Sequence, residues 1–144
     1  MHGTLSQIHA QPFIRDVYRQ RGDEGGHYRV WTEGPLLRVE ARGHWDMATA
    51  DAYARDVRRV VGELRAVRPG LRAIVDRRGM PSFAPGAHEA LQELYHEIQQ
   101  PGDRIAMVVD SSLTKGVLRQ ITGREDTQSF LAISAARTWV LAYG

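Results

Sequence analysis

Two short apolar runs constrain the fold of this chain more than any other feature of its sequence. Leu71 to Val75 and the stretch RIAMVVD at 104–110 are apolar at almost every position, and each is closed by an aspartate. A strand without alternation is covered on both of its faces, which is typical of parallel strands at the centre of an α/β sheet. The sequence therefore predicts a sheet that is enclosed between helices.

Helical patterns separate and follow these runs. Residues 46–67 carry apolar side chains at steps of three and four, with Asp46 as a suitable N-cap. Further helices are predicted over 86–100, 111–122 and 135–143, the last with Ser134 as its cap. Residues 28–41 alternate as a hairpin that turns at Gly34-Pro35, and 129–133 is a candidate edge strand. This order predicts an α/β fold: a mixed sheet of four to five strands, with parallel central strands and about four helices.

The first 26 residues are expected to form an N-terminal arm or linker ahead of an α/β domain over residues 27–144. Phe13, Ile14, Val17 and Tyr18 have the spacing of a short amphipathic helix. The polar, glycine-rich segment RGDEGG at 21–26 is typical of a linker. The sequence leaves open whether the arm docks on the domain, docks on a second subunit or is disordered.

Composition excludes several classes of protein. A chain of 144 residues with 42% hydrophobic residues is that of one ordinary globular domain. No apolar run approaches the roughly 20 residues of a membrane span, so no integral membrane segment is predicted. The start of the chain lacks the basic and apolar regions of a secretory signal, and the chain has no cysteine. Together these features fit a cytoplasmic protein.

Charge and motifs argue against nucleic acid, metal and cofactor binding. The net charge is only +2, and the arginines are interleaved with acidic residues rather than gathered into a basic stripe. His88 and His96 lie eight apart on a predicted helix, roughly 12 Å from each other, so one metal ion cannot bridge them. No glycine-rich phosphate-binding motif occurs, and no cofactor is expected.

Ligands of open α/β sheets bind beyond the carboxyl ends of the parallel strands. That edge should gather carboxylates, hydroxyls, cations and a histidine: His44, Trp45, Asp46, Asp76, Arg77, Arg78, Ser82, Ser111, Ser112 and Lys115. These types also have structural roles, because Asp46 and the serines are preferred N-caps and Asp76 and Asp110 readily bind backbone amides or an arginine. A hydrolase triad of Ser111, His44 and Asp76 is the least favoured interpretation, since no G-x-S-x-G motif is present.

Four segments carry a resemblance to a known family: GHWDMATADAYARDV, LRAIVDRRG, RIAMVVDSSLTKGVLRQI and FLAISAARTWV. Their order and spacing resemble the STAS fold over residues 28–142, in particular the SpoIIAA-like group of small bacterial domains also labelled STAS/SEC14. The resemblance implies a regulatory module that binds a protein. In the anti-anti-sigma branch a serine at the start of the helix after the central strand is phosphorylated. Here the matching position is Pro85 or Gly86, and Ser82 is the nearest hydroxyl.

Two functions therefore follow from the sequence. The first is a non-catalytic regulatory protein-interaction module without the usual phosphoserine, which binds a protein partner or forms a homodimer through the arm or an exposed sheet edge. The alternative is a carrier or sensor of a small apolar or acidic, lipid-like ligand. Its pocket would be lined by aromatic and methionine side chains for which an ordinary core is the favoured interpretation: Trp31, Trp45, Met47, Met80 and Phe83.

Overall fold

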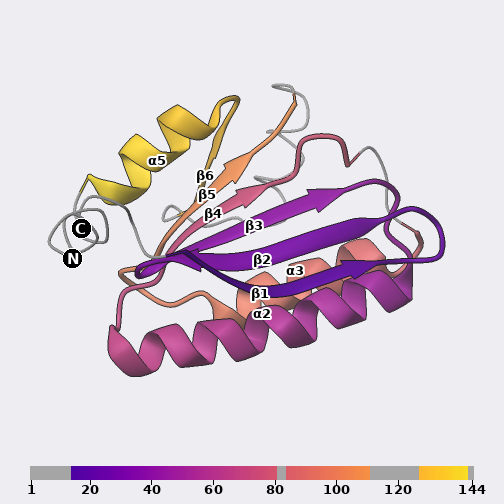
Figure 1. Cartoon of the computed structure of the whole chain (residues 1–144), viewed down its shortest axis with the longest axis horizontal. Coiled ribbons are helices and arrows are strands. Elements are labelled where there is room, and N and C mark those ends of the chain that lie inside the picture. The colour runs from indigo at the N-terminus through magenta and orange to yellow at the C-terminus, as the bar shows by residue number, and fades with distance from the viewer. Residues whose placement is uncertain (1–13, 81–83, 111–126, 143–144) are drawn as a thin grey trace, which may run out of the picture.

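A computed structural model describes residues 14–80, 84–110 and 127–142 (Figure 1). Six strands and three helices lie within these residues. They are β1 (Ile14–Arg21), β2 (His27–Glu33), β3 (Leu36–Arg42), α2 (Met47–Val67), β4 (Arg72–Asp76), α3 (Ala87–Ile98), β5 (Arg104–Val108), β6 (Thr127–Phe130) and α5 (Ile133–Leu141). The helix predicted over 111–122 lies outside the described residues.

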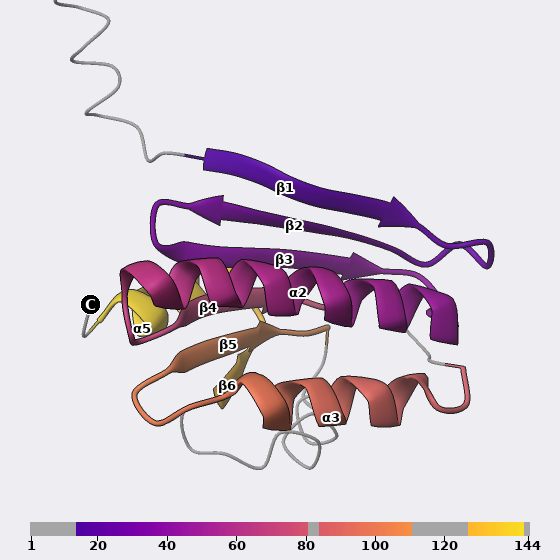
Figure 2. The ribbon, with the colours of Figure 1, turned by 90° about the horizontal axis from the view of Figure 1, so that it is seen from below.

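The strands form one mixed sheet in which the spatial order is the chain order, β1-β2-β3-β4-β5-β6. β1, β2 and β3 pair antiparallel, whereas β3, β4, β5 and β6 pair parallel. The crossovers through α2 and α3 step in the same direction across the sheet, so right-handed connections place both helices on the same face (Figure 2). The mixed sheet with parallel central strands confirms the sequence prediction, with six described strands rather than four or five.

The additional strand is β1, where the sequence predicted a helix. This prediction is wrong: β1 pairs with β2 from Ile14 opposite Glu33 to Arg21 opposite His27. The register shifts between Asp16 and Tyr18, and at such a bulge neighbouring side chains can share one face. Val17 and Tyr18 both pack against the core, and this adjacent apolar pair imitated the stripe of a helix.

The segment interpreted as a linker is the turn between β1 and β2. The backbone N–H of Gly22 donates to the carbonyl of Gly26 at 2.6 Å, and Gly25 donates back to Gly22 at 3.3 Å. The polar, glycine-rich composition of residues 21–26 therefore serves a hairpin turn.

The two faces of the sheet have separate cores. Under α2 and α3 lie alternate side chains of every strand from β2 to β5, including Tyr28, Val30, Val39, Val75 and Met107. On the opposite face, α5 covers a smaller cluster formed by Leu36, Ile74, Ala106, Val108, Ala136 and Val140. β4 and β5 are thus covered on both faces, which explains their uninterrupted apolar sequences.

The helix ends test the predicted caps. Asp46 is confirmed as the N-cap of α2, because its Oδ1 accepts hydrogen bonds from the Thr49 backbone N–H at 2.8 Å and from the Thr49 hydroxyl at 2.7 Å. The predicted cap Ser134 is wrong, since α5 already begins at Ile133. Ile133 packs against the small apolar cluster, and this contact draws it into the helix. Within the described ranges, no helix is long and apolar enough to cross a membrane.

Candidate functional site

The carboxyl end of β4 holds a buried carboxylate between two arginines. Asp76 is only 3% exposed. Its Oδ2 accepts hydrogen bonds from Arg42 Nη2 at 2.8 Å and Arg78 Nη2 at 2.9 Å. Its Oδ1 accepts from Arg78 Nε at 3.0 Å and from the Arg78 backbone N–H at 3.1 Å. Asp76 thus binds a backbone amide and arginines, as the structural interpretation of its sequence position expected.

The buried Asp76 carboxyl is ionised at neutral pH. Burial raises the pKa of the Asp76 carboxyl, but hydrogen bonds from Arg78 and Arg42 outweigh this effect and hold the pKa below its ordinary value. The Arg42 and Arg78 side chains remain 24% and 39% exposed. One buried carboxylate therefore positions two guanidinium groups that solvent, or another molecule, can reach.

Residues 77–80, at the start of the loop after β4, are also fixed through their backbone. The Gly79 N–H donates to Asp110 Oδ2 at 2.9 Å, beyond the end of β5. The Gly79 carbonyl accepts from the Gly43 N–H at 2.8 Å, after the end of β3. Gly79 has φ of +73°, in the left-handed region, and a side chain there would press on Arg42 Cδ at 3.0 Å. Glycine thus lets the loop join the ends of its two neighbouring strands.

Arg77 points to the other face of the sheet and does not join the exposed cluster. It is 5% exposed and lies with Trp45, Tyr53 and Tyr95 around a gap that has no room for a water-sized molecule. Its Nη2 contacts Met80 Sδ at 3.7 Å. The alternation of a strand continues past Asp76, so consecutive residues face opposite sides. This predicted site residue therefore belongs to the core under α2 and α3.

Trp45 and His44 also separate. Trp45 is fully buried, stacks edge-on against Tyr53 with ring centroids 4.9 Å apart, and donates from Nε1 to the Arg42 carbonyl at 3.1 Å. His44 is partly exposed, and its Nε2 lies 3.5 Å from Glu24 Oε2 in the β1–β2 turn. Trp45 therefore fixes the backbone that carries Arg42, and His44 borders the site.

The remaining candidates lie outside the described residues: Ser82, Ser111, Ser112 and Lys115. The hydrolase interpretation depends on Ser111 and so stays a prediction. Within the described part of the chain, no group of three or more His, Asp or Glu residues could hold a metal ion.

Sequence reasoning missed Arg42, which supplies half of the cationic cluster. Its signal was present in β3, where Arg38, Glu40 and Arg42 alternate with buried apolar residues. Alternation of this kind marks a strand with one polar face. What the pattern could not give was the partner, because Asp76 lies 34 positions further along the chain.

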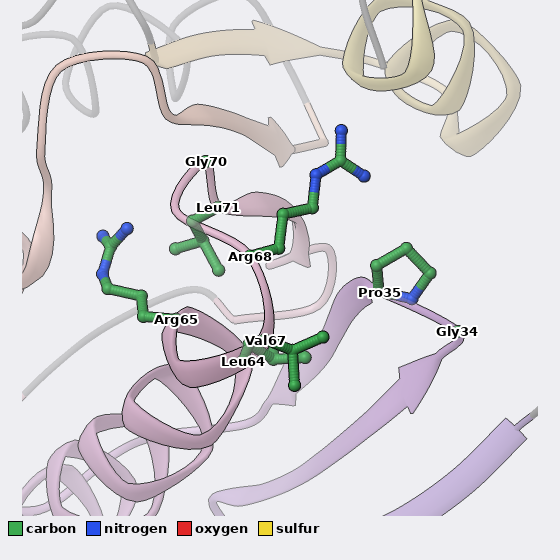
Figure 3. Close-up of a pocket in the computed structure, with 8 residues that line it drawn as sticks. All are labelled: Gly34, Pro35, Leu64, Arg65, Val67, Arg68, Gly70 and Leu71. Carbon is green, nitrogen blue, oxygen red and sulfur yellow. The ribbon is translucent and has the colours of Figure 1, made fainter.

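An apolar pocket lies at the opposite end of the sheet, where α2 ends near the β2–β3 turn (Figure 3). It encloses about 260 Å³ and is lined by Gly34, Pro35, Leu64, Arg65, Val67, Arg68, Gly70 and Leu71. The lining predicted for a carrier is not found here. Trp31 packs on the face of the sheet away from α2, between Arg29 and Arg38, whereas Trp45 is buried under α2. The two rings therefore cannot line one pocket, and Phe83 lies outside the described residues.

Comparison with known proteins supports the fold. No protein-family model matches the chain, and no curated protein does. An uncharacterised protein of the DUF3478 family from Shewanella loihica PV-4, with a SpoIIAA-like fold, is 15% identical over 90% of this chain and 94% of that chain, with a TM-score of 0.58. The murine Slc26a9 anion transporter is 16% identical over 97% of this chain and 24% of its own, with a TM-score of 0.54.

A third solved structure, an anti-sigma factor antagonist from Mycobacterium paratuberculosis, is 16% identical over 89% of this chain and 94% of that chain, with a TM-score of 0.47. The likeness to the Shewanella protein and to the transporter confirms the predicted class: the chain has an α/β fold of the STAS type. In particular, the fold is SpoIIAA-like.

Proposed function

We propose that this protein is a regulatory module that binds a protein partner through the loop after β4. The observation that carries the proposal is the arginine pair held by Asp76 at the carboxyl edge of the sheet. Because residues 77–80 of this loop are tied to the ends of β3 and β5, they lose little conformational freedom when a partner binds. Exposed, positioned guanidinium groups are favoured contacts in protein interfaces.

The start of α3 supports a module that works without the usual phosphoserine. α3 is preceded by Gly86, whose φ of +87° is in the left-handed region, and no side chain caps the helix. Pro85 and Gly86, which match the phosphorylated position of the related branch, have no hydroxyl group. Recognition at this edge would then depend on the fixed cations of Arg42 and Arg78 rather than on an added phosphate.

A site-specific photocrosslinker tests this function in cells that produce the protein. Placed at Arg78, it should give one defined protein adduct, identified by mass spectrometry. The matched control is Arg55, an exposed arginine on α2. The purified partner should then lose affinity for the Arg78→Glu variant and keep it for Arg55→Glu. No adduct at position 78, or equal adducts at both positions, would overturn the proposal.

The apolar pocket of Figure 3 favours a second candidate, a carrier of a small apolar ligand. Its volume of about 260 Å³ is slightly smaller than the roughly 300 Å³ of the smallest pockets that bind drug-sized ligands, so it suits a ligand smaller than these. Native mass spectrometry of gently purified protein decides between the two functions and also counts subunits. A retained small molecule that Leu64→Trp displaces would support the carrier. Protein without a bound molecule would contradict it and leave the interaction module, as a monomer or a homodimer.

A further inference from the structure

Most of one face of β1, β2 and β3 is not covered by any described helix; α5 reaches its margin at Leu36 of β3 and Glu33 of β2. α5 packs over β4, β5 and β6 on this side of the sheet, while α2 and α3 lie on the other (Figure 1). The strand register places charged side chains of this face in two rows. One row is Arg21, His27 and Arg42, and the next is Arg19, Arg29, Glu40 and Asp76.

These rows border a shallow groove of about 390 Å³, lined by Arg19, Gln20, Arg21, His27, Tyr28, Arg29 and Glu40. Three guanidinium groups thus face one carboxylate. Asp16, beside the groove, binds Arg29 at 2.6 Å and lies 3.7 Å from Arg19. Arg21 is exposed, and among the described residues no carboxylate pairs with it. The groove therefore keeps an excess of positive charge.

Arg29, which lines the groove, is held in place. Arg29 Nε donates to Asp16 at 2.6 Å, and the guanidinium stacks on the Trp31 ring at 4.0 Å from its centroid. Arg38 stacks on the same ring at 4.9 Å, and Trp31 is only 5% exposed. Because Arg29 is already paired and stacked, the more exposed Arg19 and Arg21 are the groups of the groove left to bind an anion.

We propose that an acidic, extended segment of the protein partner lies in this groove, with carboxylates on Arg19 and Arg21. The inference rests on the proposed function, because His27 and Arg42 are paired in register and connect the groove to the loop after β4. Arginine binds carboxylates through paired, directional hydrogen bonds. Trp31 and Tyr28, beside the groove, are buried, so neither of these rings is available to stack on a base.

The first test uses a fluorescein-labelled peptide of alternating Glu and Gly residues and the full chain, with binding followed by anisotropy. Arg21→Glu should weaken binding by at least about tenfold, because it reverses the charge of an accessible contact. Arg55→Glu changes the net charge equally but lies on α2, and it should weaken binding less than about twofold. A matched Gln-Gly peptide should not bind.

The possible results separate this inference from the function on which it rests. Equal losses of peptide affinity in Arg21→Glu and Arg55→Glu would show only a general attraction between the peptide and a positively charged protein. A single-stranded DNA probe that binds more tightly than the Glu-Gly peptide would indicate a nucleic-acid partner. Either result overturns the acidic segment. If the photocrosslinker at Arg78 captures a partner whose affinity Arg21→Glu leaves unchanged, the groove proposal is wrong and the proposed function at the loop after β4 stands. If the peptide binds through Arg21 and the photocrosslinker at position 78 captures no partner, the proposed binding site at the loop after β4 is wrong and the groove proposal stands.

Discussion

The two ends of the parallel sheet each bury an aspartate beside arginine, yet the two clusters are built differently. At the amino end Asp103 is 1% exposed and accepts from Arg65 at 3.0 and 2.7 Å. It also accepts from the backbone N–H groups of Leu71 at 2.9 Å and Gln100 at 2.8 Å. At the carboxyl end Asp76 is nearly as buried, but the backbone N–H groups of its own loop supply only one of its hydrogen bonds.

The difference lies in the arginines. The Arg65 side chain is 16% exposed and also donates to the carbonyls of Pro69 and Ile98. Its guanidinium group is therefore bound within the fold. Arg42 and Arg78 are more exposed, at 24% and 39%, although Arg42 also donates to the carbonyls of Ala41 and Asp76 and lies 3.9 Å from Glu40. The same chemical pair therefore closes the structure at one end and holds cations toward solvent at the other.

The largest expected effect on stability is at the amino end of the sheet, at Asp103. Asp103→Asn removes the charge that Arg65 and two backbone amides face, and we expect the free energy of unfolding to fall by roughly 3 kcal/mol. Urea denaturation of the variant and the wild type measures the difference. Asp51→Asn, at an exposed site on α2, is the control and should change stability little. A loss no larger than that of the control would contradict a structural role for Asp103.

Acid should erase the same difference. Burial raises the pKa of the Asp103 carboxyl. Hydrogen bonds from Arg65 and from the two backbone N–H groups lower this pKa by more, so the folded-state pKa is below the ordinary value. The stabilisation is therefore full above the unfolded pKa of about 4 and disappears as pH falls through the folded pKa. Repeating the urea titrations from pH 7 downward should show the wild type and Asp103→Asn converging only below about pH 4.

A smaller loss of stability is expected at the carboxyl end of the sheet, at Asp76. Asp76→Asn should lower the free energy of unfolding by roughly 1–2 kcal/mol, because water can solvate the released Arg42 and Arg78. The same substitution should release the Arg78 side chain, which NMR relaxation of its Nε–H group would detect. A loss equal to that of Asp103→Asn would remove the distinction between the two ends.

The smallest change in stability is expected for Arg78→Gln. Because the side chain is substantially exposed, its ion pair should contribute less than about 1 kcal/mol to folding. Binding of the partner captured at this position should nevertheless weaken by about tenfold or more. Calorimetric titration of the variant beside Arg55→Gln compares the two exposed arginines. Unchanged affinity with lowered stability would make Arg78 a structural residue only.

Local patterns predicted much of the fold, because burial and periodicity are written into neighbouring residues. The apolar sequences of β4 and β5, the stripe of α2 and the cap at Asp46 all confirm this. β1 escaped because a bulge puts Val17 and Tyr18 side by side against the core, and no local rule distinguishes that from a helical stripe.

The site was less predictable because its members come from distant strands. Asp76 could be placed at the strand edge, but its contact with Arg42 depends on the parallel register of β3 and β4. Arg77 and Arg78 are alike in the sequence, and only the alternation beyond the strand end buries one and exposes the other. The proposed ligand-binding role of the residues at this edge stays a prediction.

The order of the strands also bears on how the protein is made. Because every strand pairs with the one before it in the chain, a ribosome delivers each new strand to an edge that already exists. No earlier pairing must open to admit a later strand. The hairpins from β1 to β3 are local, whereas β4 and β5 must each wait for a whole helix to emerge. Synthesis can therefore start from the antiparallel end and extend the sheet one strand at a time.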